Sequence, residues 1–188
     1  SRGLGDVYKR QGLCNAQRGY RITGNLGQLQ QDTFYLVVPN LNGTVNVLGV
    51  SILKEGNLEF AGQVPEPVMA TIMTSDRQGM IPLMLENTDY SVQIGTESIE
   101  VKGGVEQAVF NQFNTLQREA KKQQQKLQSD MKTAYEDANQ MRVQALSGQA
   151  QKFMQDMQKR QTEIVKENAN TSTAAYIVLT CGLQAPVE

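Results

Sequence analysis

The chain has 188 residues, with 18 Lys and Arg, 19 Asp and Glu, no His and a formal net charge of −1. This length suits one or two small domains rather than a large enzyme. A mildly acidic chain lacks the clustered Lys and Arg that bind nucleic-acid phosphates or anionic membranes, and no stretch approaches the roughly 18 consecutive apolar residues of a membrane-spanning helix. The composition therefore argues against nucleic-acid binding and against a membrane span.

Residues 1–11 resemble the translation of a transposon adapter that is used to fragment DNA for sequencing. We interpret this segment as an artefact of the adapter and exclude it from fold reasoning. A genuine polar N-terminal tail is the alternative. Without the segment, the loss of Arg2, Lys9, Arg10 and Asp6 moves the formal net charge from −1 to −3.

Residues 12–16 are typical of the end of a secretory signal peptide. Small residues, Cys14 and Ala16, occupy the −3 and −1 positions before a cleavage site at Gln17. We therefore expect an exported protein of the periplasm or cell envelope. A lipoprotein acylated on Cys14 fits less well because Leu13 is bulky, and an ordinary N-terminal loop is a further alternative. After cleavage Cys181 would be a single thiol, which forms neither a Cys-x-x-Cys pair nor a zinc cage.

Residues 17–104 alternate apolar and polar positions between turn signals, which predicts half-buried strands. Pro65 and Pro67 mark a connection between strands. About eight strands at this spacing favour an antiparallel β-sandwich, or a barrel, within an α+β chain. The strands are expected at Tyr20–Ile22, 33–38, 45–53, 58–60, 68–73, 80–85, 90–94 and 99–101. Their core residues include Tyr20, Leu36, Val47, Phe60, Ile72, Leu83, Val92 and Ile99.

Residues 105–188 change to Gln, Lys, Glu, Ala and Met, which favour helices, and we expect three to four of them. Ser129-Asp130 is predicted to cap a second helix, Ser147-Gly148 to end it, and Asn170-Thr171-Ser172 to cap the last one. Packing of these helices on one another or on the sandwich is favoured over a dimeric coiled coil, because Ala and Met outnumber Leu and Ile. The apolar stripe contains Val109, Phe113, Leu116, Ala120, Leu127, Met131, Ala134, Ala138, Met141 and Ala145.

The sequence assigns no catalytic, cofactor-binding or metal-binding residue and no cofactor. It has no His to act as a general base, and no phosphate-binding or nucleophile-elbow motif. Gly49-Val50-Ser51 lacks the final glycine of such an elbow. The remaining candidates have structural explanations as solvated charges or turn and cap residues. They are the carboxylates Glu86, Asp89, Glu97, Glu100 and Glu136-Asp137, and the glycosylation patterns Asn42-Gly43-Thr44 and Asn170-Thr171-Ser172.

Several short motifs occur in the order found in one known family. They are Tyr20–Gly24, the run 55–64 (EGNLEFAGQV) followed by Glu66-Pro67, the strand end 83–87 (LMLEN), and 101–104 (VKGG) before the helices. In this order they resemble the domain of unknown function 4369, found in exported proteins of Bacteroidota. Leu58 replaces an aromatic residue of the family pattern.

The resemblance implies a context rather than a catalytic site. Members of the family typically precede a thioredoxin-like domain of the thiol–disulfide oxidoreductase or peroxiredoxin-like type. Residues 105–188 would then be a helical connector that is cut before that domain, whose Cys-x-x-Cys would follow Glu188. The resemblance implies a non-catalytic accessory region with the thioredoxin-like domain, and protein substrates, as partners. The alternative is a self-contained structural or interaction module with the helices as its binding surface.

Overall fold

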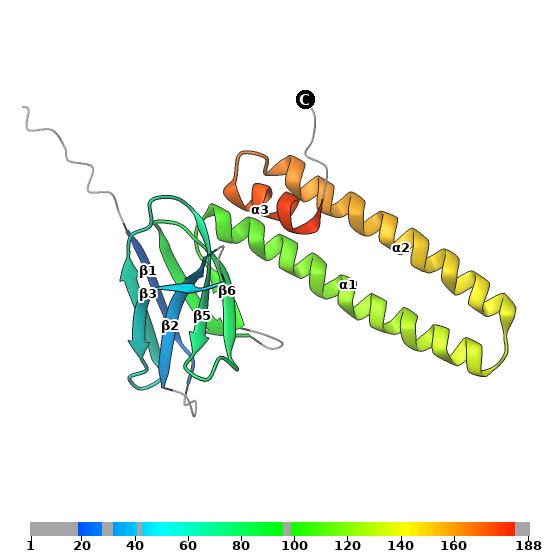
Figure 1. Cartoon of the computed structure of the whole chain (residues 1–188), viewed down its shortest axis with the longest axis horizontal. Coiled ribbons are helices and arrows are strands. Elements are labelled where there is room, and N and C mark those ends of the chain that lie inside the picture. Colours follow the sequence, from blue (N-terminus) through cyan, green and yellow to red (C-terminus); the bar gives the residue numbers. More distant parts are fainter. Residues whose placement is uncertain (1–18, 28–31, 41–42, 96–98, 183–188) are drawn as a thin grey trace, which may run out of the picture.

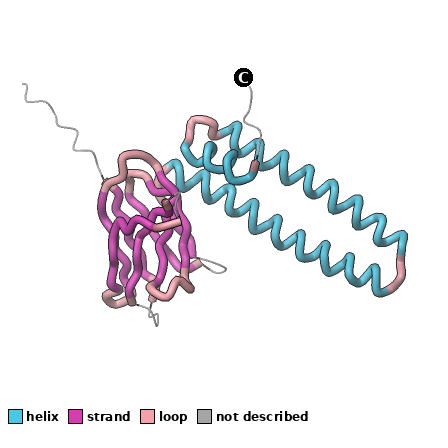
Figure 2. The backbone as a smooth tube through the Cα atoms, viewed as in Figure 1, coloured by secondary structure: helices cyan, strands magenta, loops and turns pink. Residues whose placement is uncertain are grey.

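Eight strands are followed by three helices, and the predicted α+β fold is confirmed (Figure 1, Figure 2). The computed structural model describes residues 19–27, 32–40, 43–95 and 99–182. The elements are β1 (Tyr20–Asn25), β2 (Thr33–Pro39), β3 (Val45–Ile52), β4 (Asn57–Gly62), β5 (Val68–Thr74), β6 (Met80–Leu85), β7 (Asp89–Ile94), β8 (Ile99–Lys102), α1 (Val105–Glu136), α2 (Gln140–Glu167) and α3 (Ser172–Cys181).

The strands form two four-stranded sheets that pack face to face. Sheet A has the order β4-β1-β7-β8, and sheet B has the order β3-β2-β5-β6. All paired strands are antiparallel except β1 and β7, which run parallel. The predicted sandwich is therefore confirmed, with a parallel pair in the middle of sheet A. Strands β8 and β6 are edge strands, and the sandwich meets the helices beside them.

One apolar core fills the space between the sheets, because alternate residues of each strand point inward. Burying these side chains supplies the main driving force for folding, at roughly 25 cal/mol per Å². The inward set comes from both sheets, so neither sheet is stable as a single layer. Six of the predicted core residues lie in it: Tyr20, Leu36, Phe60, Ile72, Leu83 and Val92.

The prediction of a core position was wrong for two residues, Val47 and Ile99. The side chain of Val47 is 50% exposed. Leu36 pairs with Gly49 but Val37 pairs with Val47, so Leu48 is an extra residue in β3. Such a bulge reverses which side chains point outward beyond it, and simple alternation along a sequence does not reveal it. Ile99 is exposed because it starts the short edge strand β8.

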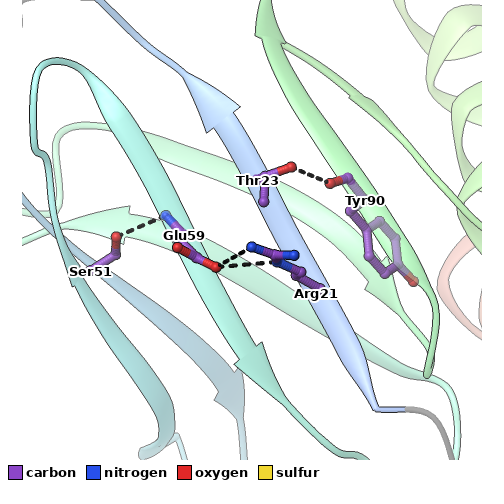
Figure 3. A network of polar contacts seen from close by, with 5 residues as sticks. All are labelled: Arg21, Thr23, Ser51, Glu59 and Tyr90. Carbon is purple, nitrogen blue, oxygen red and sulfur yellow. Dashed lines mark hydrogen bonds and ion pairs between the residues drawn. The ribbon is translucent and has the colours of Figure 1, made fainter.

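The outer face of sheet A is charged and solvated (Figure 3). The Arg21 guanidinium donates two hydrogen bonds, of 3.1 and 2.9 Å, to one carboxylate oxygen of Glu59 on the neighbouring strand. Both side chains are more than half exposed, so the pair adds little to stability. On the other side of β4, the backbone N–H of Glu59 donates to the Ser51 hydroxyl at 3.0 Å. This bond joins the edges of the two sheets.

The predicted helix boundaries at Ser129-Asp130 and Ser147-Gly148 were wrong. Helix α1 continues from Val105 to Glu136, because the Gln and Lys residues in its middle are good helix formers. Helix α2 starts after Asn139, whose side chain accepts a hydrogen bond from the N–H of Arg142, and it continues past Gly148. Glycine costs only about 1 kcal/mol inside a helix, so it does not stop this one. The predicted cap of the last helix is confirmed, since Thr171 accepts from Ala174 N–H.

Helices α1 and α2 form an antiparallel pair, here called the helical arm, which projects from the sandwich (Figure 1). Its root lies next to the sandwich and packs with α3, and its tip is the turn between the two helices. Two separate clusters hold the arm, and no residue of α1 between Leu116 and Leu127 is buried. No described helix is long and apolar enough to cross a membrane. The root cluster contains Val109, Phe113, Val165, Ala174 and Ile177, and the tip cluster contains Leu127, Ala134 and Leu146.

A matched pair of substitutions tests that Val92 lies in the core and that Val47 lies on the outer face. Val92→Ala removes two methyl groups from a fully buried site and should lower the free energy of unfolding by about 2 kcal/mol. Val47→Ala removes the same atoms from the outer face and should cost less than about 0.5 kcal/mol. Urea denaturation measures both values. Equal losses for the two variants would contradict the bulged register.

Gly148 offers a test of the helix assignment. A Cβ added at this position would meet no other atom within 4 Å, so alanine fits without strain. Because Gly148 lies inside α2, Gly148→Ala should stabilise the arm by about 0.5–1 kcal/mol and increase its helical circular dichroism. If the helix ended at this glycine instead, the substitution would leave the helical signal unchanged or weaken it.

Candidate functional site

The carboxylate of Glu86 caps the start of α1 at the root. Glu86 follows β6, and its Oε1 accepts a hydrogen bond of 3.0 Å from the backbone N–H of Glu106. Gly104 lies between them with a φ of 67°, a conformation that favours glycine. A Cβ at Gly104 would overlap the Glu86 carboxylate. The glycine therefore permits the close approach that places a negative charge on the helix N-terminus.

Glu106 repeats this arrangement one helix later. Its carboxylate is buried and accepts hydrogen bonds from the N–H groups of Ser172 and Thr173, at 3.0 and 2.7 Å. The Thr173 hydroxyl donates to the same carboxylate at 2.6 Å. These donors belong to the first turn of α3, whose partial positive charge favours an anion. A carboxylate of α1 thus fixes the direction in which α3 leaves the arm.

A chain of side-chain amides joins α1 to both sheets. The backbone N–H of Met84 in β6 donates to Oε1 of Gln107 at 2.8 Å. Nε2 of Gln107 donates to Oδ1 of Asn111 at 2.9 Å, and Nδ2 of Asn111 donates to the carbonyl of Val101 in β8 at 2.8 Å. Gln107 is only 1% exposed, so these bonds form away from water.

The amide chain also closes the edges of the sandwich. Edge strands expose unpaired backbone groups, which proteins cover or block. The outward N–H of Met84 is bound by Gln107, and alternation along β6 gives Pro82 the same outward position. Proline has no N–H, so a further strand cannot pair there. The hydrogen bond from Met84 to Gln107 therefore both protects the edge of sheet B and attaches α1 to the sandwich.

Tyr90 anchors the network from inside the sandwich. Its hydroxyl donates to the carbonyl of Met84 at 2.9 Å and accepts from the backbone N–H of Glu86 at 2.8 Å. Burial raises the pKa of Tyr90 above its usual value, so the hydroxyl keeps its proton over the physiological range. The turn that carries the Glu86 cap is thereby held to the core.

A groove of about 600 Å³ lies between α1 and the two edge strands. Met80, Pro82 and Ile99 supply apolar surface, and Gln107 and Asn111 lie at its inner end. The charged lining residues are Glu100, Lys102, Arg118 and Lys121. A groove with an apolar floor, three cationic side chains and one carboxylate is suited to binding a ligand. The described lining contains no cysteine and no pair of carboxylates, so the groove has no evident nucleophile or acid–base pair.

Those carboxylates considered from the sequence that the structure describes do not form an acid–base pair. Glu86 caps a helix, Glu100 forms an exposed ion pair with Lys102 at 3.3 Å, and Asp89 is exposed. Glu136 and Asp137 lie at the tip of the arm. Glu97 lies outside the described residues. Within the part of the chain that the structure describes, acidic residues and cysteines nowhere gather in a group of three that would suit a metal ion.

The other sequence candidates have structural roles or lie outside the described residues. Ser51 is buried and accepts a backbone hydrogen bond, as a residue inside β3. Cys181 is a free thiol at the end of α3. Thr171 is a helix cap within its glycosylation pattern, whereas Asn42 of the other pattern is not described, nor is the stretch 12–16 with Cys14.

Sequence reasoning missed the residues that build the root. Glu106, Gln107 and Asn111 are polar residues at the start of a helix, where solvated side chains are common. One signal was present: Gln107 and Asn111 are four residues apart and lie on one helix face. The residues that they bind, Met84 and Val101, are distant in sequence, and only the folded sandwich brings them together.

Removing the Glu106 carboxylate tests the contact between α1 and α3. Glu106→Ala leaves the N–H groups of Ser172 and Thr173 without their acceptor, while the Thr173 hydroxyl keeps the backbone carbonyl of residue 106, so it should lower the free energy of unfolding by about 2 kcal/mol. Hydrogen exchange of the Thr173 amide should accelerate. Glu163→Ala, at an exposed position of α2, is the control and should change stability by less than about 0.5 kcal/mol. Equal stability of the two variants would contradict the capping role.

Residues 20–110 match a protein-family model described as Domain of unknown function (DUF4369). No curated protein and no solved structure matches the chain. The matched range covers all eight strands and the first turns of α1, so it includes Glu86, Glu106 and Gln107. Residues 20–110 of this chain therefore form a DUF4369 domain.

Proposed function

We propose that the chain is a non-catalytic accessory region of an exported, cell-envelope protein of the thiol–disulfide oxidoreductase type. Its role is to position a thioredoxin-like domain, encoded beyond Glu188, and to help select the partners of that domain. The family resemblance supports this context. The arrangement of the root supports the positioning role.

The fixed root is the observation that carries this proposal. Two carboxylates and one chain of amides connect β6, β8, α1 and α3 at a single place. Phe110 of α1 and Tyr176 of α3 add an edge-to-face ring contact of 6.4 Å. As a result α3, the last described element, packs against α1 and α2 at the root of the arm instead of extending from its tip (Figure 2). A domain joined after α3 would be held near the root of the arm.

The cysteines support a non-catalytic role for these residues. Thioredoxin-type reduction of a disulfide uses two thiols of one protein, which cycle between a dithiol and a disulfide. The sequence has only Cys14 and Cys181 and no Cys-x-x-Cys. Cys181 alone supplies one thiol at the end of α3.

A self-contained interaction module is the second candidate. Large apolar side chains on the arm favour it, since Tyr135, Met141 and Met154 are all strongly exposed. Exposed apolar side chains on a helix supply contact surface for a partner. The DNA that follows the codon for Glu188 separates the candidates. A strand followed by Cys-x-x-Cys supports the accessory role, and a stop codon supports the self-contained module.

An insulin-reduction assay tests the lack of catalysis. The 188-residue chain with dithiothreitol should precipitate insulin no faster than dithiothreitol alone, because a single thiol cannot complete the cycle. Thioredoxin is the positive control, and Cys181→Ser should behave like the wild type. Turnover that persists in the Cys181→Ser variant would refute the non-catalytic assignment.

A further inference from the structure

The two sheets differ sharply in charge. The four strands of sheet B contain no Asp, Glu, Lys or Arg at all. The strands of sheet A, of similar length, contain five charged residues. Solvated sheet faces normally alternate apolar residues toward the core with polar residues toward water. Sheet A follows this rule, and sheet B does not.

The uncharged outer face of sheet B is open on its β3 side, whereas Val37 and Met84 on the same face are buried. Its most exposed part is the β3 ridge, which we define as Val45, Val47, Val50 and Ile52, each about half exposed. Tyr35 of β2 pairs with Val50 on one side and with Met73 of β5 on the other, so the apolar surface continues across the sheet. Met80 extends it onto β6.

The bulge in β3 is what creates this ridge. In an unbroken strand, residues separated by an odd number of positions face opposite sides of a sheet. The extra residue Leu48 instead places Val47 and Val50 on the same outer side, while Leu48 packs toward the core. Four β-branched side chains therefore line one exposed strand. Monomeric proteins rarely leave a continuous apolar patch of this kind open to water.

Helix α1 covers only one margin of this face. Met84 of β6 is buried and its backbone binds Gln107 of α1, whereas Met80 on the same strand is 63% exposed. Among the described residues, none buries the β3 ridge. An occupant must present an uncharged surface, since a buried charge without a partner would be costly. The outer face of sheet A is charged and does not qualify.

We propose that two copies of this chain associate through the outer faces of sheet B, around a two-fold axis. The same face on a second copy is uncharged, has the same dimensions and carries the same twist. A two-fold interface brings identical patches together, so the β3 ridge of each copy is buried in the dimer. Packed sheets lie about 10 Å apart, a distance that interdigitating Val, Ile, Tyr and Met side chains fill.

The area of the face determines how strongly two copies are expected to associate. The three strands that α1 leaves open, about 4.8 Å apart and about seven residues long at about 3.4 Å per residue, give a flat footprint of roughly 340 Å². Two such faces bury on the order of 700 Å² before the relief of the side chains is counted, which suits a weak, transient contact rather than a permanent interface. We therefore expect a reversible dimer whose population depends on concentration.

Apposed faces fit the structure better than paired edges. Strand β3 is an edge strand, and two copies of such a strand can pair through their backbones. The bulge at Leu48 interrupts the regular row of outward N–H and C=O groups that this pairing needs. The bulge does not interrupt the apolar face, because Val47 and Val50 on either side of it both point outward.

Sedimentation equilibrium of the full 188-residue chain tests the proposal. The wild type should shift from the mass of one chain to that of two as concentration rises through the micromolar range. Val50→Lys should raise the dissociation constant at least tenfold, because each substitution places two lysines in the symmetric interface. Val47→Lys should do the same. A thermal melt of each variant, followed by circular dichroism, verifies that it is folded.

Ile94→Lys is the matched control. Ile94 lies on β7 of sheet A and is 59% exposed, close to the 54% of Val50. It should leave the dissociation constant unchanged. A wild type that stays monomeric at about 1 mM would overturn the proposal. A dimer that Met154→Lys on the arm disrupts, and that folded Val50→Lys and Val47→Lys leave intact, would also overturn it and assign the contact to the helices.

Discussion

The buried carboxylate of Glu106 is the interaction on which the helical half depends. Its hydrogen-bond donors are two N–H groups and a hydroxyl at the start of α3. A buried anion with such donors is tolerated only while they stay in place. The carboxylate therefore fixes the angle between α1 and α3. Because the Glu86 carboxylate and the amides of Gln107 and Asn111 fix α1 on the sandwich, the same constraint reaches both sheets.

The two sheets of the sandwich differ in the surface that they present to water. Sheet A presents charged residues to water and ends at β8, whose Val101 carbonyl binds Asn111 of α1. Sheet B presents an uncharged face and ends at β6, where Pro82 and Gln107 block further pairing. The edges that meet the helices are thus closed. The open surface of sheet B lies instead on its outer face.

The sequence predicted what repeats along the chain and missed what depends on distant residues. Alternation located all eight strands, and Tyr20 and Leu83 are buried as expected. The position of Val47 was wrong because one inserted residue changes the side-chain direction without changing the composition. Helix breaks were placed at Ser129 and Gly148 on local signals, which continuous helix-forming neighbours override. The root could not be predicted from local pattern, because its hydrogen bonds join residues that are far apart in sequence.

The helical arm is held at two places with a polar stretch between them, and this has a consequence for its motions. The root cluster is tied to the sandwich, whereas the tip cluster has only Leu127, Ala134 and Leu146 as buried residues. Between them the helices share an exposed ion pair of Arg160 with Glu119 at 2.9 Å. Regions with few buried contacts open at a lower free energy than the rest of a protein. The tip can therefore fray and re-form as a separate cooperative unit while the root stays packed.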